Sequence, residues 1–96
     1  MRIVFIGAVA FSHSALERLV SMGADIVGVC TLKESKFNSD HVDLSHISAL
    51  HGIPWLYVDD INSVESIEWI KRKAPDVIFC FGWSKLLKQR LLELAS

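Results

Sequence analysis

The strongest candidate for a ligand-binding feature follows the last long apolar run of the chain. Gly82 allows a sharp exit from that run, and Trp83 with the pair Leu86–Leu87 then presents a large apolar surface. A flat heteroaromatic ligand could bind there, with backbone N–H and C=O groups hydrogen-bonding to its edge. The same residues fit equally well an alternative in which Trp83 and the leucines pack beneath a final helix.

A second candidate is the loop of residues 7–12, Gly-Ala-Val-Ala-Phe-Ser. It leads into an amphipathic segment, and the N–H groups and dipole at a helix N-terminus favour an anion. Ser12, His13 and Ser14 add polar groups, so we expect a phosphate or carboxylate subsite. The alternative is that Ser12 or Ser14 only caps the helix, the latter in a capping box with Glu17. The loop has only Gly7 of the three glycines in a dinucleotide fingerprint, and the chain has no Walker loop.

The remaining chemical groups point to no catalytic centre. His41, His46 and His51 recur every five residues, so on one helix they would point about 140° apart and would not converge on a metal. Cys30 and Cys80 end apolar runs that are not expected to be neighbours, which argues against a disulfide. Neither cysteine has a visible histidine–acid partner for thiol catalysis. We therefore expect binding residues here, and neither a metal nor catalytic residues.

The elements that position these residues follow from hydrophobic patterning. Four apolar runs lack the polar alternation of a strand with one wet face, so we interpret them as strands covered on both faces. These runs are residues 3–6, 26–30, 55–58 and 77–81. Helical patterns lie between them and after the last, near residues 15–20, 44–50, 64–70 and from 86 onward.

This alternation predicts an α/β fold, a Rossmann-like doubly wound parallel sheet with strand order 3-2-1-4. The first and fourth strands are then neighbours where the winding reverses, and ligands of open α/β sheets bind outside the carboxyl ends at that point. We therefore expect the loops 7–12 and 82–85 to flank one crevice. The fourth strand would be an apolar edge, so we expect the sheet to be incomplete and covered by a further strand or by a second copy in a homodimer.

Composition excludes several classes. The chain has 96 residues, 51% of them hydrophobic and 22% charged, with a net charge of −1. Disorder and nonspecific nucleic-acid or membrane binding are not favoured, and no apolar run approaches the roughly 18 residues of a membrane span. Two cysteines are too few for a disulfide scaffold. We expect a cytoplasmic protein; reading residues 1–15 as a signal peptide fits less well, because Gly7 interrupts the run and a helix follows.

Two stretches carry a resemblance to a known family. The opening Met-Arg-Ile-Val-Phe-Ile-Gly and the stretch 75–87, with its Phe-Gly-Trp-Ser and Leu-Leu, resemble the N-terminal half of formyltetrahydrofolate-dependent formyltransferases. That family includes methionyl-tRNA, glycinamide-ribonucleotide and amino-sugar formyltransferases. The resemblance covers essentially the whole chain. It implies that residues 1–96 are the N-terminal half of a Rossmann-like catalytic domain that uses formyltetrahydrofolate as formyl donor.

The resemblance also assigns positions. In the family, the loop after the fourth strand receives the pterin ring, largely through main-chain contacts, and the first loop lies on the acceptor side. The donor-binding positions carried over are Gly82, Trp83, Lys85, Leu86 and Leu87. The acceptor-side positions are Gly7, Ala8, Phe11, Ser12 and His13. The family's catalytic Asn, His and Asp lie downstream, from an Asn-x-His-type motif on the next strand, so we expect this segment alone to be inactive.

The acceptor and two rival functions stay open at this point. A tRNA acceptor calls for basic surface, whereas the polar loop 33–40 carries two lysines against two acids. This charge balance slightly favours a small amine, such as an amino sugar on a nucleotide, with tRNA possible; the same loop could act as a substrate lid or only be solvated. The rivals are a dinucleotide-binding module of an oxidoreductase and a noncatalytic interaction domain that pairs through its fourth strand.

Overall fold

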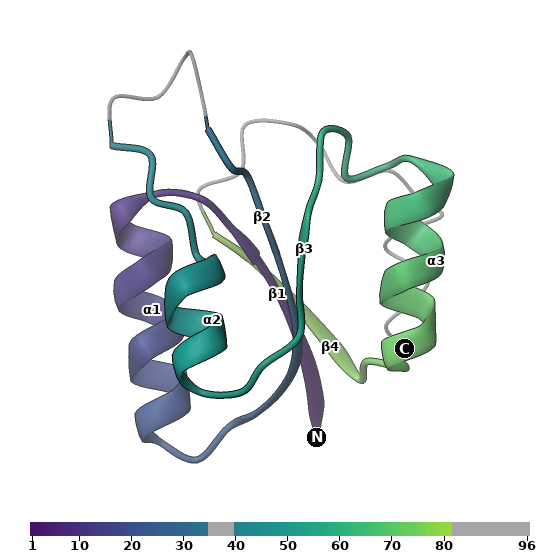
Figure 1. Cartoon of the computed structure of the whole chain (residues 1–96). Helices are drawn as coiled ribbons and strands as arrows, with labels where there is room; N and C mark the ends of the chain where they lie inside the picture. Colours follow the sequence, from purple (N-terminus) through teal and green to yellow (C-terminus); the bar gives the residue numbers. More distant parts are fainter. Residues whose placement is uncertain (35–39, 82–96) are drawn as a thin grey trace.

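The computed structural model describes residues 1–34 and 40–81, which form a single parallel sheet with helices on both faces (Figure 1). The strands are β1 (Arg2–Gly7), β2 (Asp25–Thr31), β3 (Trp55–Tyr57) and β4 (Val77–Phe81). The helices are α1 (Ala10–Ser21), α2 (Ser45–Leu50) and α3 (Val64–Lys73). The strand order is β3-β2-β1-β4, which confirms the predicted Rossmann-like arrangement. The helix expected from residue 86 lies outside the described residues.

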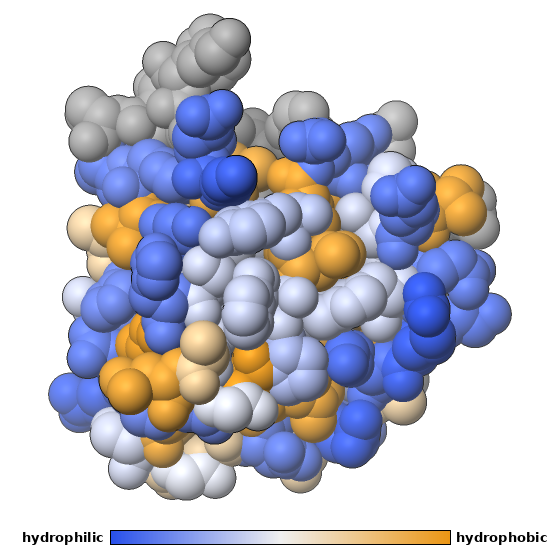
Figure 2. Space-filling view, in the orientation of Figure 1, coloured by the Kyte–Doolittle hydropathy of each residue, from blue (hydrophilic) through white to orange (hydrophobic). Residues whose placement is uncertain are grey.

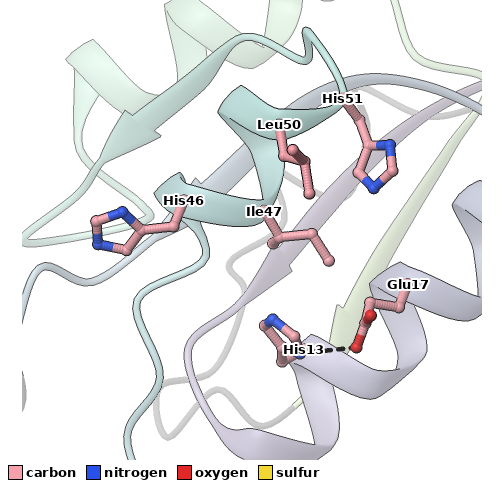
Figure 3. Close-up of a pocket in the computed structure, with 6 residues that line it drawn as sticks. All are labelled: His13, Glu17, His46, Ile47, Leu50 and His51. Carbon is pink, nitrogen blue, oxygen red and sulfur yellow. Dashed lines mark ion pairs between the residues drawn. The ribbon is translucent and has the colours of Figure 1, made fainter.

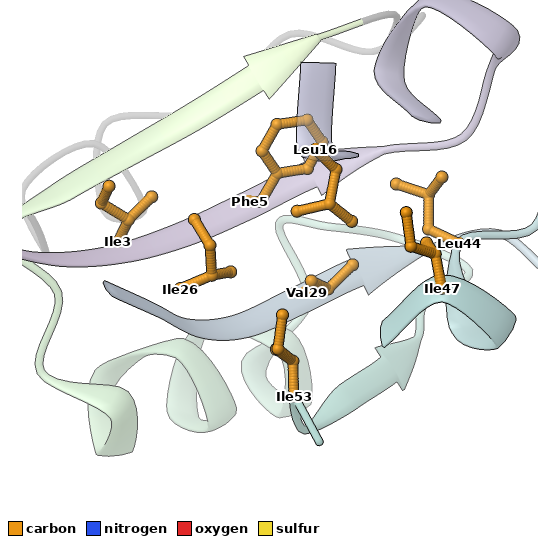
Figure 4. Close-up of a cluster of buried hydrophobic side chains, with 8 residues drawn as sticks. All are labelled: Ile3, Phe5, Leu16, Ile26, Val29, Leu44, Ile47 and Ile53. Atoms are coloured by element: carbon orange, nitrogen blue, oxygen red, sulfur yellow. The ribbon is translucent and has the colours of Figure 1, made fainter. Parts of the chain in front are cut away.

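Helices lie on both faces of the sheet, and the central strands β1 and β2 are largely buried between them. Helices α1 and α2 cover one face and α3 covers the other (Figure 1). The α1–α2 cluster, drawn in Figure 4, consists of Ile3, Phe5, Leu16, Ile26, Val29, Leu44, Ile47 and Ile53. The α3 cluster consists of Val4, Ile6, Cys30, Val58, Ile61, Ile67 and Ile70. Because alternate residues from Ile3 to Ile6 of β1 enter different clusters, all four of these positions are apolar, and this explains the unbroken hydrophobic run.

Helix α3 shows how local sequence sets an element's ends. Ser63 caps its start by accepting a hydrogen bond from the N–H of Ser66 at 3.2 Å. At the other end, the Arg2 guanidinium donates to the carbonyl of Lys73 at 2.6 Å and to that of Ala74 at 3.2 Å. A cation at this end also complements the helix dipole. The Arg2 contacts fix α3 against the start of β1.

The two edges of the described sheet differ. On one side, β3 has only three residues, and Trp55 and Tyr57 are partly exposed on it. Figure 2 shows several separate hydrophobic patches among hydrophilic side chains on the face viewed. On the other side, β4 pairs with β1 and exposes Cys80; its pairing with a second copy stays a prediction.

No helix in the described part of the chain is long and apolar enough to span a membrane.

A carboxylate joins the start of α2 to the end of β3. Asp43 accepts hydrogen bonds from the Ser45 N–H at 2.8 Å and from the Tyr57 hydroxyl at 2.7 Å. Partial burial raises the pKa of Asp43, but these hydrogen bonds, together with one from the Ser45 side chain and the nearby charge of His46, outweigh it. The pKa of Asp43 therefore lies below its ordinary value.

Replacing Asp43 with asparagine should lower the free energy of unfolding at neutral pH by about 1 kcal/mol, the usual net contribution of one intramolecular hydrogen bond. Since the folded-state pKa is depressed, the stabilisation by Asp43 is present above the unfolded pKa of about 4 and is lost as pH falls through the folded pKa. Urea midpoints measured from neutral pH to about pH 3 should therefore fall more steeply for the wild type than for Asp43→Asn. The control is Asp59→Asn, at an exposed position. Identical pH profiles of the urea midpoint for wild type and Asp43→Asn would contradict the predicted contribution of Asp43.

Candidate functional site

The carboxyl ends of β1 and β4 lie side by side. The two strands run parallel in a continuous register in which Ile6 pairs with Cys80 and Gly7 pairs with Phe81. The loop that leaves β1 and the chain that leaves β4 therefore start from adjacent points, at the end of the sheet where the strands have their carboxyl ends. This confirms the adjacency on which the predicted crevice depends, at the position where ligands of open α/β sheets bind.

A buried junction holds these two ends together. Ser12, in the first turn of α1, is fully buried, and its hydroxyl donates to the carbonyl oxygen of Phe81 at 2.6 Å. The same hydroxyl accepts a longer bond from the N–H of Val9 at 3.4 Å. A Cβ added to Gly7 would lie 2.6 Å from Cβ and Oγ of Ser12 and 2.8 Å from the Phe81 oxygen. The junction therefore admits no side chain at residue 7.

Helix α1 begins earlier than the sequence indicated. Its first residue is Ala10, and Val9 is the extended N-cap residue. The predicted capping box between Ser14 and Glu17 is wrong, because both residues lie inside the helix. Glu17 instead pairs with His13, one turn earlier, with 3.1 Å between Nδ1 and Oε1.

Aromatic rings continue from the core to the surface at this edge. The Phe81 ring lies 5.5 Å from Phe5 and 6.0 Å from Phe79, and 5.7 Å from Phe11 in an edge-to-face arrangement. Phe5 is fully buried, whereas Phe11 is 65% exposed. Phe11 is thus an accessible aromatic surface beside the buried junction.

The segment that follows the polar loop crosses over the start of α1. The N–H of Ala10 donates to the Asp40 carbonyl at 3.0 Å, and that of Val42 donates to the Ala8 carbonyl at 2.9 Å. His41 Nε2 lies 2.8 Å from the Leu32 carbonyl. One N–H of the expected anion subsite is therefore already engaged, and anion binding there stays a prediction. The pairing joins segments about thirty residues apart, so no local pattern in the sequence indicated it.

The predicted site residues fall into separate groups. On the acceptor side, Gly7, Ala8 and Ser12 are buried, Phe11 is exposed, and His13 is partly exposed on α1. The donor-binding positions lie outside the described residues: Gly82, Trp83, Lys85, Leu86 and Leu87. Within the polar loop, residues 35–39 also lie outside them, so its role as a lid stays a prediction.

A groove between α1 and α2 was not anticipated. It has a volume of about 320 Å³ and is lined by His13, Glu17, His46, Ile47, Leu50 and His51 (Figure 3). The sequence placed His13 on another helix and predicted that His46 and His51 would point apart, so spacing gave no sign that all three line one groove. Within residues 1–34 and 40–81, no three His, Cys, Asp or Glu side chains are grouped so that they could hold a metal ion.

The two cysteines are free thiols with different surroundings. Cys30 is buried and Cys80 is exposed, and both pair in register with Ile6, on opposite sides of β1. The strands that carry them are therefore not neighbours, as predicted. Burial raises the pKa of Cys30 to about 12 and also raises the pKa of Cys80. Neither environment favours a nucleophilic thiolate.

The topology and the edge junction define a Rossmann-like α/β protein whose candidate site lies at the carboxyl ends of β1 and β4. No protein-family model matches the chain. A methionyl-tRNA formyltransferase of Thermotoga sp. (strain RQ2) is 30% identical over 100 residues, covering 100% of this chain and 32% of that protein. Those of Thermotoga maritima and Bacillus pumilus are 30% and 32% identical, covering 98% and 96% of this chain and 31% and 30% of each relative.

These similarities confirm the resemblance found in the sequence: the chain resembles formyltransferases. In particular, it is similar along its whole length to methionyl-tRNA formyltransferases. The chain spans about a third of the length of the curated relatives that it matches.

Proposed function

We propose that this chain is the N-terminal half of a catalytic domain that transfers a formyl group from formyltetrahydrofolate to methionyl-tRNA. The observation that carries the proposal is the pairing of Gly7 with Phe81. Transfer between two bound molecules requires the acceptor amine and the formyl carbon to meet at one place. Two chain segments that leave the sheet from paired residues, at the carboxyl ends of β1 and β4, would bring the two bound molecules to one place.

The proposal gives each loop a role. The chain that follows Phe81 would bind the donor through Gly82, Trp83, Lys85, Leu86 and Leu87. The loop that follows β1 would lie on the acceptor side, where Phe11 offers exposed aromatic surface and His13 a partly exposed imidazole. The segment would supply binding surfaces without the groups that move protons, and we expect it to be inactive by itself.

The relatives change the expected acceptor. The slight preference for an amino sugar came from the balanced charges of the loop 33–40 and from the net charge of −1 over the 96 residues. The relatives named above are about three times longer and are named methionyl-tRNA formyltransferases, so the charge of this segment says little about the surface that meets a tRNA. Methionyl-tRNA is therefore the proposed acceptor, and a nucleotide-linked amino sugar is the alternative.

The oxidoreductase alternative loses support at the first loop. A dinucleotide fingerprint needs a backbone that a pyrophosphate can approach closely. Here Ala8 and Val9 are buried, and the N–H of Ala10 is bonded to Asp40. These features argue against a pyrophosphate at this loop.

Replacing Trp83 with alanine should weaken tetrahydrofolate binding by roughly 1–3 kcal/mol, because an aromatic platform for the pterin ring is removed. Isothermal titration of tetrahydrofolate into the chain and its variants measures this effect. The control is Trp55→Ala on β3, two strands away from β1 and on the far side of the sheet from β4. Equal affinities for wild type and Trp83→Ala would contradict the proposed donor site, and saturable binding of NAD instead would favour an oxidoreductase module.

A further inference from the structure

The outer side of β3 is an edge of the described sheet. There β3 has one neighbour, β2, and it lies in the middle of the view in Figure 1. We propose that β3 pairs antiparallel with β3 of a second copy of this chain, about a two-fold axis at Leu56, so that the two sheets become continuous. The proposal concerns how the chain assembles and does not depend on the proposed function.

The hydrogen bonds to β2 show which backbone groups of β3 point outward. The carbonyl of Pro54 accepts from β2 at 3.0 Å, and the N–H of Val58 donates to β2 at 3.0 Å. Within a strand, the N–H and C=O of one residue point to the same side, and successive residues alternate. The groups of Leu56 therefore also face β2, whereas those of Trp55 and Tyr57 face away from it. An edge strand offers such outward groups to a further strand.

One antiparallel register uses both outward-facing residues of each copy. When Leu56 lies opposite Leu56 of the second copy, Trp55 lies opposite Tyr57 of that copy, and Tyr57 lies opposite its Trp55. Each of these pairs exchanges two backbone hydrogen bonds, as closely spaced pairs in antiparallel sheets do. A shift by one residue would set inward-facing groups against outward-facing ones, and a shift by two would leave part of the outward-facing groups without a strand residue opposite.

The side chains of this edge match the same register. Trp55 and Tyr57 are 41% and 42% exposed. Both lie on the α2 face, because the Tyr57 hydroxyl is 2.8 Å from that of Ser45 and alternate strand residues share a face. In the register centred on Leu56, each tryptophan therefore meets a tyrosine across the strands, and cross-strand aromatic pairs stabilise antiparallel sheets. The Tyr57 ring is already ordered by its hydrogen bond to Asp43 at 2.7 Å, so pairing costs little side-chain entropy.

The edge lacks the features that usually keep edge strands apart. Monomeric proteins protect such strands with charged side chains, proline or a bulge. The residues of β3 are Trp-Leu-Tyr, without a charge. Pro54 does not block the outer side, because its nitrogen, like its carbonyl, faces β2. Figure 2 shows pale, weakly polar side chains over β3 in the middle of the face viewed.

The flanks of β3 make the edge complementary to itself. The exposed His51 precedes the strand, and the exposed Asp59 and Asp60 follow it. Antiparallel pairing brings the segment before β3 of one copy beside the segment after β3 of the other. The imidazole is then on the side where the second copy carries carboxylates, and the two pairs of aspartates stay apart. A surface that matches itself in backbone, rings and charge is the kind that two copies share around a two-fold axis.

The first test is the mass of the 96-residue chain by sedimentation equilibrium. A three-residue strand forms a small interface, so we expect a reversible dimer of the 10.8 kDa chain with a dissociation constant on the order of 100 μM. Trp55→Lys removes a ring and places a charge on the edge, and it should raise that constant at least tenfold. Cys80→Lys, at an exposed position of the β4 edge, is the matched control and should leave it unchanged. Circular dichroism checks that both variants fold.

The second test measures the register by disulfide formation with oxidised glutathione. Leu56→Cys sets two thiols opposite each other in a pair without backbone hydrogen bonds, where Cα atoms are about 4.5 Å apart, a spacing that a disulfide spans. The two copies of Asp59→Cys would lie about 20 Å apart, because the residue is three positions from the axis. Both variants carry Cys80→Ser to remove the exposed native thiol. Leu56→Cys should form a covalent dimer on non-reducing gels several times faster than Asp59→Cys.

Each outcome decides for or against the proposal. A chain that stays monomeric at about 1 mM, well above the expected constant, overturns it. A dimer that Cys80→Lys dissociates and Trp55→Lys does not would pair through β4, and one that neither variant dissociates would use another surface; both results overturn it. Equal rates of disulfide formation for Leu56→Cys and Asp59→Cys overturn the register. If a lysine variant does not fold, the comparison of disulfide rates decides alone.

Discussion

Replacing Gly7 with alanine is expected to destabilise the fold by roughly 3 kcal/mol, near the upper end for overpacking a close-packed site. The added Cβ would lie 2.6 Å from Cβ and Oγ of Ser12 and 2.8 Å from the Phe81 oxygen. None of these atoms is the free end of a flexible side chain, so α1 or β4 must move. Urea denaturation followed by circular dichroism measures the loss, which is a large part of the stability of a small domain.

A double-mutant cycle checks the cause. Ser12→Gly removes both side-chain atoms that the new Cβ would meet, so Gly7→Ala should cost less in that background than in the wild type. Part of the cost should remain, because the Phe81 oxygen stays 2.8 Å from the Cβ position. An unchanged urea midpoint for Gly7→Ala, or an equal cost in both backgrounds, would refute the packing argument.

Replacing Phe5 with alanine should lower the free energy of unfolding by about 3–5 kcal/mol, the range for deleting a buried aromatic side chain. Phe5 is fully buried at the centre of the α1–α2 cluster, and its ring lies 5.5 Å from that of Phe81 (Figure 4). Its removal would leave a cavity beneath the junction of β1 and β4. The same urea denaturation experiment measures the loss.

Phe11 is the matched control for Phe5. It also contacts the Phe81 ring, at 5.7 Å, but it is 65% exposed. Phe11→Ala should therefore cost no more than about 1 kcal/mol of stability, since little buried surface is lost. A loss as large as that of Phe5→Ala would mean that the surface ring, and not the core ring, holds the edge together.

Much of the fold could be predicted because its central strands, β1 and β2, are covered on both faces; the prediction that all four strands are covered was wrong for β3, where Trp55 and Tyr57 are exposed. Residues such as Val4 and Phe5 enter opposite clusters, so β1 is apolar from Ile3 to Ile6 and stands out without any knowledge of its partners. The strand order then followed from short connections and right-handed crossovers. The start of α1 was less predictable, because Ser14 resembles a cap locally whereas the helix begins directly after β1, at Ala10.

The candidate site could be predicted only in outline. The adjacency of the β1 and β4 ends is a property of strand order, so topology alone indicated it. The bond from Ser12 to Phe81 joins residues 69 positions apart. The hydrogen bond from the Ala10 N–H to the Asp40 carbonyl joins the start of α1 to the segment between β2 and α2. Contacts of this kind depend on side-chain packing in the finished fold, which residue spacing does not encode.

The central place of β1 has a consequence for how the chain assembles. This strand is synthesised before the other three described strands, yet its partners on one side belong to residues 77–81. Half of its ladder must therefore wait until some seventy further residues have been added, and closure of so long a loop slows folding. Until then Ile3 to Ile6 form an unpaired hydrophobic edge on the nascent chain, the state in which chaperones protect a growing polypeptide from aggregation.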